Sequence, residues 1–374
     1  MITGIKYLSP TFDHSGYGEA SRNCIKALLT TGVPLTLQRK AFEATEAETY
    51  GKFGATLKNL IDKDIPYSHK IIHLTPEHYC EVKHRDLKAK NVGFMYWETD
   101  KIVKQWVDSI NSSVDAQLVC CDYTKEALLK SGVTVPIYKI LPPFDATEYL
   151  DPKPYSIEGV GSDDYLFYSI FQWTERKNPI GLLLAYLTEF TSDDKVALVL
   201  KTYRSNTSAQ EQNAIMQVIT ALKHDLSLKN YPKICFIGGL LSKEQMLGLH
   251  SAGDCFVLPH RSEGLGMPHA EAMASGNPAI TTGLGGNMEF TNEQNSYLLK
   301  YQMVPVCGMP WIPWYRGDQL WGEPDIGQLK QVMRYVYNNR EEAKNKGQLA
   351  RETIKEKLNI EKIGKEFIEV LEKI

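Results

Sequence analysis

The sequence predicts an α/β protein built from two doubly wound domains, each with a parallel sheet covered by helices. Short apolar runs alternate with amphipathic stretches along the chain, which is the pattern of repeated βαβ units. Near the middle, prolines and glycines crowd between Pro142 and Gly161, which disfavours regular structure and is typical of an interdomain linker. The 374 residues are too many for one ordinary α/β core and sufficient for two.

The first series of elements precedes this linker. Apolar runs of five to seven residues predict the strands, and apolar positions at helical spacing predict the helices, which stop at glycines. Strands are expected at 2–8, 70–74, 91–96 and 117–121, and helices at 19–29 and 124–130. We therefore predict a first domain over residues 1–150.

The second series follows the linker and is more regular. Strands are expected at 165–171, 196–200, 233–237, 255–258 and 279–281. Helices are expected at 179–190, 210–226, 243–251, 268–275, 325–338, 340–357 and 360–374. This series predicts a second domain over residues 151–357, followed by a last helix within 358–374.

Composition excludes several classes of function. Hydrophobic residues make up 43% and charged residues 23%, as in a globular protein, and a net charge of -3 gives no general attraction to nucleic acid or anionic membranes. The seven cysteines are scattered without CxxC spacing, which argues against a disulfide framework or zinc site and for a reducing compartment. Because no signal-peptide core or run of 18 apolar residues is present, we expect a cytoplasmic protein with no stable membrane insertion.

The segment 259–276 carries the most informative motif. A strand leads into a loop with two glycines, and the next helix is expected to open at Pro268. The loop amides and the helix N-terminus form an anion site suited to a diphosphate. Glu263 and Glu271 are expected at opposite ends of one small pocket, where carboxylates accept hydrogen bonds from vicinal sugar hydroxyls. The alternative is that Glu271 only stabilises the helix electrostatically and Glu263 is solvated.

This segment, with 241–259 before it and 282–289 after it, resembles the donor motif of retaining GT-B glycosyltransferases of family 4, the glycosyl transferases group 1. The resemblance covers about 165–355 and is weak over the first 150 residues. It implies two Rossmann-like domains facing a central cleft, with the acceptor side in the first domain and the donor site in the second. It also implies that the last helix, within 358–374, crosses back to the N-terminal domain.

The resemblance assigns roles in the donor motif. It implies that Glu271 holds the ribose hydroxyls of a nucleoside-diphosphate sugar and that Glu263 holds the ring hydroxyls of the transferred sugar. The backbone amides of four residues would face the sugar and the phosphates: Gly264, Leu265, Gly266 and Met267.

A second loop, 171–179, resembles the basic diphosphate loop of the same family. Arg176 and Lys177 would stabilise the charge that develops on the leaving phosphate when the anomeric bond breaks. The family often has an arginine six residues before the lysine, where this chain has Phe171. We expect Lys201 to supply that second cation, with Arg204 as the alternative, unless the site is less charged. A solvated pair on a loop also remains possible.

Two N-terminal segments complete the candidate site. The turn 15–22 is a near miss to a dinucleotide-binding GxGxxG motif, and the resemblance implies that Gly16 and Gly18 lie near the phosphates and the acceptor. A tight strand-to-helix turn explains these glycines equally well. After the strand 91–96, Trp97 and Glu98 stand where many relatives have a sugar-contacting histidine. Trp97 could stack on a sugar and Glu98 could position an acceptor hydroxyl, but core packing and a surface salt bridge explain them too.

These observations predict a retaining, metal-independent glycosyltransferase that moves a sugar from a nucleoside-diphosphate sugar to an acceptor hydroxyl. Asp62 and Asp64 match a metal-binding DxD pattern, but no suitable strand precedes them. The alternatives are a non-catalytic sugar-nucleotide-binding subunit and an epimerase or hydrolase on the same fold. The acceptor stays open among a glycan, a lipid-linked glycan, a protein, a small molecule and a modified nucleic acid, as do the base, the sugar, the linkage and the oligomeric state.

Overall fold

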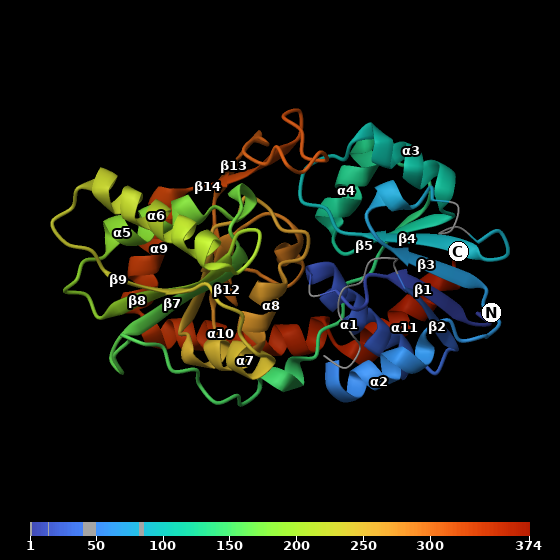
Figure 1. Ribbon diagram of the computed structural model, residues 1–374, viewed down its shortest axis with the longest axis horizontal. Helices are drawn as coiled ribbons and strands as arrows, with labels where there is room; N and C mark the ends of the chain where they lie inside the picture. The colour runs from blue at the N-terminus through green and yellow to red at the C-terminus, as the bar shows by residue number, and fades with distance from the viewer. Residues whose placement is uncertain (1, 14, 40–49, 82–85) are drawn as a thin grey trace. The chain divides into compact units, whose positions relative to one another are not determined.

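The computed structural model describes residues 2–13, 15–39, 50–81 and 86–374. The chain divides into two compact units (Figure 1). Unit 1 comprises Met1–Asp145 and Lys357–Ile374, and unit 2 comprises Ala146–Glu356. Each unit contains a six-stranded parallel sheet, so the prediction of two Rossmann-like α/β domains is confirmed.

Unit 1 has the strand order β2-β1-β3-β4-β5-β6. Its strands are β1 (Ile5–Ser9), β2 (Leu35–Arg39), β3 (His69–His73), β4 (Lys90–Met95), β5 (Ala116–Val119) and β6 (Ile137–Lys139), and every pair is parallel. Its α-helices are α1 (Gly16–Thr30), α2 (Gly51–Leu60), α3 (Lys104–Ser113), α4 (Asp122–Ser131) and α11 (Ile360–Leu371).

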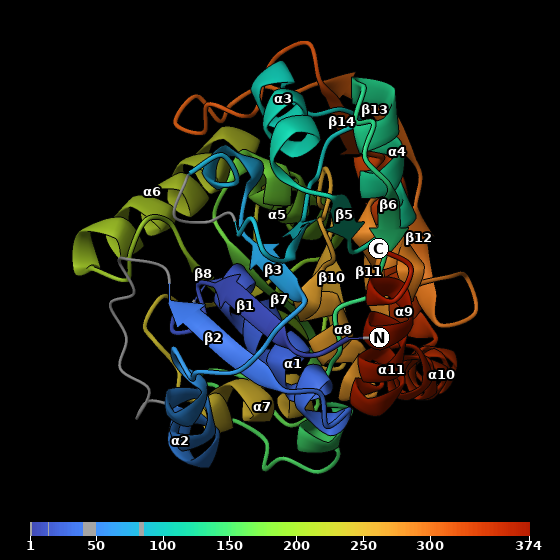
Figure 2. The ribbon, with the colours of Figure 1, turned by 90° about the vertical axis from the view of Figure 1, so that its right-hand side faces the viewer.

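Close helix packing explains how the C-terminal segment is held in unit 1. The helix α11 packs on α1, and Figure 2 shows the two lying side by side. Gly364 makes this approach possible, since a Cβ at this position would overlap the carbonyl oxygen of Ala27. The apolar face of α11 buries Ile363, Phe367 and Leu371. A strongly amphipathic sequence thus gives the last helix one buried face.

Unit 2 has the strand order β12-β11-β10-β7-β8-β9. Its main strands are β7 (Tyr165–Gln172), β8 (Val196–Tyr203), β9 (Lys233–Ile237), β10 (Cys255–Leu258), β11 (Ala279–Thr282) and β12 (Ser296–Leu299). Its α-helices are α5 (Pro179–Glu189), α6 (Ala209–Leu226), α7 (Lys243–Ala252), α8 (Met267–Ala274), α9 (Ile326–Asn338) and α10 (Arg340–Lys357). A separate antiparallel ribbon pairs β13 (Tyr301–Pro305) with β14 (Leu320–Pro324).

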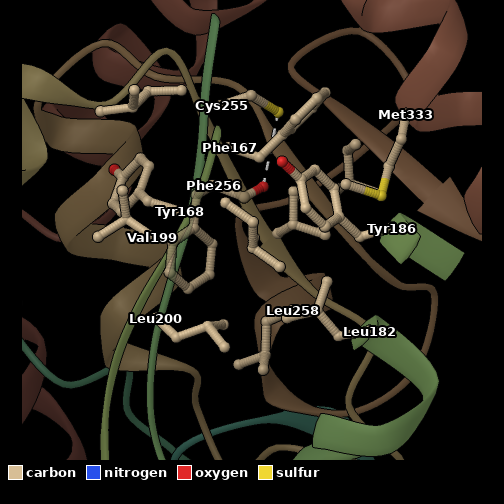
Figure 3. Packing of buried hydrophobic residues seen from close by; sticks show 14 of the residues in the cluster. Phe167, Tyr168, Leu182, Tyr186, Val199, Leu200, Cys255, Phe256, Leu258 and Met333 are labelled. Atoms are coloured by element: carbon tan, nitrogen blue, oxygen red, sulfur yellow. Dashed lines mark hydrogen bonds between the residues drawn. The ribbon is translucent and has the colours of Figure 1, made fainter. Parts of the chain in front are cut away.

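The core of unit 2 fills both faces of its central strands, as Figure 3 shows. Phe167 and Tyr168 on β7 are both fully buried although adjacent side chains of a strand point to opposite faces. Leu182 and Tyr186 of α5 cover one face. Burying each such large apolar side chain contributes about 1.5–3 kcal/mol before entropy is counted. The sheet is therefore a rigid support for the loops at its edges.

The predicted elements are all present in unit 2, and their boundaries lie within three residues of the predicted ones. The helix expected at 268–275 begins at Met267, so Pro268 occupies its second position, and β8 runs on to Tyr203. Sequence patterns missed β12 and the β13–β14 ribbon in unit 2, and β2, α2, α3 and β6 in unit 1. The missed segments of unit 1 are short or polar; α3, for example, contains three serines and an asparagine.

The linker expected between Pro142 and Gly161 contains one short 3₁₀ turn, at Ala146–Tyr149, and the division into units falls at its start.

None of the described helices is both long and apolar enough to cross a membrane. All seven cysteines lie in described parts of the chain, and each is a free thiol.

Candidate functional site

The candidate site lies at the carboxyl ends of β7 and β10. These strands are neighbours in the unit-2 sheet, with Phe167 paired to Cys255, yet they are far apart in sequence. The chain runs from β7 to β8 on one side and returns through β10 on the other. This is the topological switch point of a doubly wound sheet, where ligands bind outside the carboxyl ends of the strands. Loops 173–178 and 259–266 leave the sheet here.

Backbone contacts join the two loops. The N–H of Arg261 donates to the carbonyl oxygen of Arg176 over 2.7 Å. In return, Nη1 of Arg176 donates to the carbonyl oxygen of Ser262 over 2.9 Å. Arg261 and Ser262 lie within the segment 259–276, but the sequence patterns assigned a role to neither of them. These two hydrogen bonds hold the loops together at the switch point.

A buried ion cluster sits between the joined loops. Lys177 Nζ contacts Glu263 Oε1, and Arg176 Nη1 lies 3.2 Å from Glu263 Oε2. Glu263 is 4% exposed and Lys177 8% exposed. Burial alone would raise the pKa of the Glu263 carboxyl, but the charges of Lys177 and Arg176 outweigh burial and hold it well below its usual value. Three predicted residues therefore meet in one cluster, and Glu263 is not solvated.

The N-terminus of α8 presents free backbone donors beside this cluster. Gly266 caps the helix with φ +86°, a left-handed conformation that favours glycine. Among the described residues, the N–H groups of Leu265, Gly266 and Met267 have no hydrogen-bond acceptor. The loop is packed from behind, since a Cβ on Gly286 would overlap the backbone of Gly264. Consecutive unpaired amides at a helix N-terminus form a concave site for an anion.

Glu271 faces different neighbours from Glu263. It lies within α8, its side chain is 21% exposed, and its Oε2 is 3.4 Å from Nε2 of His250 on α7. Glu263 instead faces the loop that follows β7. The two carboxylates thus contact different neighbours, Glu271 on the side of α7 and Glu263 on the side of the loop after β7.

Lys201 fits the role of the additional cation better than Arg204. Lys201 is 7% exposed on β8, beside Ile170 of β7, and burial lowers the pKa of its ammonium group. No carboxylate in the described part of the chain forms a salt bridge with it. Arg204 is about half exposed and lies 3.6 Å from Glu211 of α6. A buried cation without an acidic partner is stabilised when an anion binds.

A buried polar network supports loop 259–266 from below. His260 Nε2 lies 3.0 Å from Thr281 Oγ1, which lies 2.8 Å from Nε2 of His269. Burial lowers the pKa of His269 to about 4 and the pKa of His260 well below its usual value, so both imidazoles are neutral at pH 7. Asn287 joins the network by donating to the carbonyl oxygen of Thr282 over 3.0 Å. This network links the start of α8 to the ends of β10 and β11.

The β13–β14 ribbon is attached to the same edge through Arg261. Its guanidinium donates to Glu323 of β14, with Nε 2.5 Å from Oε2, and also contacts Glu175 of loop 173–178. The guanidinium carbon lies 5.6 Å from the centroid of the Trp321 ring. Arg261 therefore joins both loops of the switch point to the ribbon.

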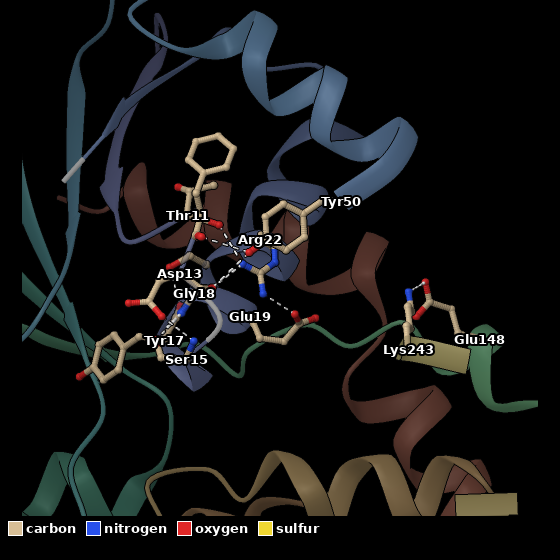
Figure 4. A network of polar contacts seen from close by, with 12 residues as sticks. Thr11, Asp13, Ser15, Tyr17, Gly18, Glu19, Arg22, Tyr50, Glu148 and Lys243 are labelled. Carbon is tan, nitrogen blue, oxygen red and sulfur yellow. Dashed lines mark hydrogen bonds and ion pairs between the residues drawn. The ribbon is translucent and has the colours of Figure 1, made fainter. Parts of the chain in front are cut away.

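The glycine turn of unit 1 is anchored by Arg22, as Figure 4 shows. Nη1 of Arg22 donates to the carbonyl oxygens of Thr11 and Asp13, each over 2.8 Å. A Cβ on Gly18 would overlap the carbonyl oxygen of Asp13, whereas one on Gly16 would meet open space. Packing in the turn thus accounts for a glycine at position 18, and the predicted approach of Gly16 and Gly18 to the phosphates and the acceptor stays a prediction.

Trp97 is a packing residue in this structure, which is the alternative that its sequence context left open. Its ring is 3% exposed and packs edge-on against Trp106, with centroids 4.6 Å apart. Its Nε1 donates to Thr99 Oγ1 over 2.7 Å and to the carbonyl oxygen of Lys101 over 2.9 Å. Burial leaves no ring face for a sugar. Glu98 is half-buried after β4, and its predicted contact with an acceptor stays a prediction.

A cavity of about 860 Å³ lies elsewhere in unit 2. Its lining includes Tyr155, Asp254, Asn277, Arg340 and Arg351. It opens at the amino ends of β7 and β10, and no predicted site residue lines it.

In the described part of the chain, no group of three or more His, Cys, Asp or Glu side chains is arranged to hold a metal ion.

Sequence comparisons connect this edge with a known family. Residues 163–302 match the family described as glycosyl transferases group 1. Uncharacterized protein 356 of Sulfolobus islandicus rod-shaped virus 1 is 24% identical over 288 residues, which cover 75% of this chain and 76% of that protein. Uncharacterized glycosyltransferase 335 of the same virus is 38% identical over 66 residues, or 18% of this chain and 20% of that protein.

Solved structures resemble the whole chain. HepE of Anabaena, in complex with UDP and glucose, is 13% identical with a TM-score of 0.68, and the match covers 100% of both chains. Sucrose-phosphate synthase of Thermosynechococcus elongatus is 14% identical with a TM-score of 0.68, covering 99% of this chain and 98% of that one. These likenesses establish the GT-B fold.

Proposed function

We propose that the protein is a retaining, metal-independent glycosyltransferase that transfers a sugar from a nucleoside-diphosphate sugar to an acceptor hydroxyl. One observation carries the proposal: the buried cluster of Glu263, Arg176 and Lys177 stands at the switch point of unit 2, next to the unpaired amides of the α8 N-terminus. The match of residues 163–302 to glycosyl transferases group 1 supports it independently.

The charges favour a diphosphate at this place. Arg176 and Lys177 bring two cations to this edge, Lys201 on the neighbouring strand is buried without a salt bridge to a described carboxylate, and the N–H groups of residues 265–267 have no acceptor among the described residues. All three features stabilise negative charge in a water-poor site. Glu271, which is partly exposed on α8, then binds the ribose hydroxyls, and Glu263 binds the transferred sugar.

The reaction balances without an enzymic nucleophile. The bond between the anomeric carbon and the phosphate oxygen breaks, and the acceptor oxygen bonds to the same face of the sugar. The acceptor proton passes to an oxygen of the leaving diphosphate, whose growing charge Lys177 and Arg176 stabilise. Preorganised cations of this kind are worth about 10²–10³ in rate. Unit 2 supplies the donor site in this proposal, and unit 1 supplies the acceptor side, with Gly16 and Glu98 as its candidate contacts.

Nucleotide binding and turnover test the proposal together. UDP is the first probe because the similar structure of HepE contains UDP and glucose. We expect UDP to raise the melting temperature of the protein, and Glu271→Ala to abolish that rise, while Glu244→Ala, at an exposed position of α7, leaves it unchanged.

An acceptor panel then separates the alternatives. Release of UDP together with a glycosylated product of unchanged anomeric configuration, seen by NMR and insensitive to EDTA, supports a retaining metal-independent transferase. An isomerised donor indicates an epimerase, and free sugar with no glycosylated product indicates a hydrolase. Donor binding without any turnover indicates a binding subunit.

A further inference from the structure

His250 lies next to Glu271, and the ring nitrogen that faces Glu271 makes no hydrogen bond with a described residue. The imidazole is 1% exposed in the last turn of α7, and its Nε2 lies 3.4 Å from Glu271 Oε2. Nε2 makes no hydrogen bond with any described residue. The 3.4 Å approach lacks hydrogen-bond geometry, so a small rotation of the carboxylate, which is on the more exposed side chain, is needed to complete the bond.

The neighbours of His250 fix which ring nitrogen carries the proton. Asn277 Nδ2 donates to the carbonyl oxygen of His250 over 2.6 Å, which determines how the Asn277 amide is turned. The same nitrogen lies 2.9 Å from the hydroxyl oxygen of Tyr168, which must accept from it. The single proton of Tyr168 is then directed to His250 Nδ1, at 3.1 Å. Because Nδ1 accepts, the proton of the neutral ring is on Nε2, facing Glu271.

Packing holds this chain of donors in place. Tyr168 is fully buried on β7, and a Cβ on Gly253 would overlap its ring. The ring of Tyr149 packs edge-on against His250, with centroids 5.8 Å apart. The chain therefore links β7, α7 and the turn after α8, three parts of the rigid core, to one carboxylate.

We infer that His250 is a positioning residue that fixes the carboxylate of Glu271 for the vicinal hydroxyls of a ribose. The inference rests on the proposed function, which gives Glu271 its ligand. An N–H held against Oε2 leaves Oε1, and the free lone pairs of Oε2, to accept from a diol. A carboxylate held in one rotamer loses less conformational freedom when the nucleotide binds. The sequence patterns did not identify three residues of this arrangement: His250, Tyr168 and Asn277.

The decisive readout is discrimination between ribose and deoxyribose, because a merely structural role for His250 does not change it. UDP and 2′-deoxy-UDP are titrated into the intact protein by calorimetry, with the matching ADP and GDP pairs alongside. We expect the wild-type protein to bind the ribonucleotide about tenfold or more tightly than its 2′-deoxy form, since one hydrogen bond to a carboxylate is lost.

The same ratio of affinities, ribonucleotide to 2′-deoxy form, is measured for four variants. Glu271→Ala should bring it close to one. His250→Ala should lower it to about threefold or less, His250→Gln should restore part of it because its amide nitrogen can occupy the place of Nε2, and Tyr168→Phe should lower it less than His250→Ala. His250→Gln and Tyr168→Phe keep the test valid if His250→Ala does not fold.

The outcomes separate the two proposals. If Glu271→Ala keeps the wild-type ratio, or the wild-type protein binds no nucleoside diphosphate, the proposed role of Glu271 fails and the inference fails with it. If Glu271→Ala abolishes the ratio while His250→Ala and His250→Gln weaken both nucleotides equally, Glu271 keeps its role and the positioning role of His250 is overturned.

Discussion

The two units form the same kind of parallel sheet, but different side chains lie at the carboxyl ends of their strands. Those beside β7 in unit 2 are charged, and those beside β3 in unit 1 are neutral. In unit 2 the edge of β7 carries a buried cluster of one carboxylate and two cations. In unit 1 the edge of β3 carries neutral and aromatic groups: His73 stacks on Phe94, with ring centroids 4.4 Å apart, and its Nδ1 lies 2.7 Å from the hydroxyl of Tyr7. Burial lowers the pKa of His73 to about 3, so it carries no charge at pH 7.

Both units therefore have a sheet edge where a ligand can bind, and the side chains at that edge determine which ligand it is. Strand order differs as well. The first strand of unit 2, β7, lies between β8 and β10, whereas the first strand of unit 1, β1, lies between β2 and β3. Both arrangements have a switch point. Only the one in unit 2 combines paired buried charges with unpaired helix amides in the described chain, which is why we propose it as the diphosphate site.

The largest expected effect is on the stability of unit 2. Glu263→Ala removes the buried carboxylate that Lys177 and Arg176 contact, which should lower the free energy of unfolding by about 3–5 kcal/mol. Urea denaturation measures it, with Glu244→Ala as the exposed control. A loss below about 1 kcal/mol would mean that the cluster is solvated, and the contrast between the two edges would disappear.

The next effect is on turnover. Lys177→Met keeps the length of the side chain and removes the charge nearest Glu263, so kcat for sugar transfer should fall about 10²–10³-fold. Lys195→Met, at an exposed position just before β8, serves as the control. A similar kcat in the Lys177 and Lys195 variants would remove the catalytic role of the cation.

A smaller effect separates the two glycines of unit 1. Gly18→Ala should cost about 1–3 kcal/mol of stability, because the new methyl group overlaps the carbonyl oxygen of Asp13. Gly16→Ala should change stability by no more than about 0.5 kcal/mol, since its Cβ meets open space. Thermal unfolding of the pair distinguishes a packing glycine from one that is free to face a ligand. Equal losses would contradict the assignment.

A separate effect is a pH dependence that arises from His73 of unit 1. The unfolded chain protonates this histidine below its usual pKa of 6.5, while the folded protein keeps it neutral down to about 3. Stability from this group is therefore complete above pH 6.5 and falls by about 1.4 kcal/mol per pH unit below it. His73→Phe should reduce the slope of unfolding free energy between pH 6.5 and 4.5 by about that amount. His224→Asn, at an exposed position of α6, should not.

Sequence patterns predicted the site better where local chemistry defines it than where distant segments meet. The glycines at 264 and 266, with Pro268, predicted a loop and helix N-terminus that the structure contains with a shift of one residue. The meeting of Glu263 with Lys177 required the strand order, since 86 residues separate them. Arg261 and His250 lie in segments that resemble the donor motif, but the resemblance gave them no role, so only their contacts with Glu175 and Glu271 identified them.

Trp97 illustrates a second limit. A tryptophan after a strand has the same local pattern whether its ring faces solvent or the core. Its burial depends on Trp106, which belongs to a helix that the sequence pattern missed. The orientation of such a side chain is set by tertiary packing, which propensity and periodicity do not record.

We propose that a nucleoside diphosphate binds at the carboxyl edge of β7 and β10. A crystal structure of the intact protein with UDP tests it most directly. We expect the diphosphate against the amides of Leu265, Gly266 and Met267, the ribose on Glu271, and Lys177 in contact with a phosphate oxygen. A UDP molecule bound at the opposite edge of the sheet, in the cavity beside Arg340 and Arg351, with the α8 N-terminus empty, would contradict it.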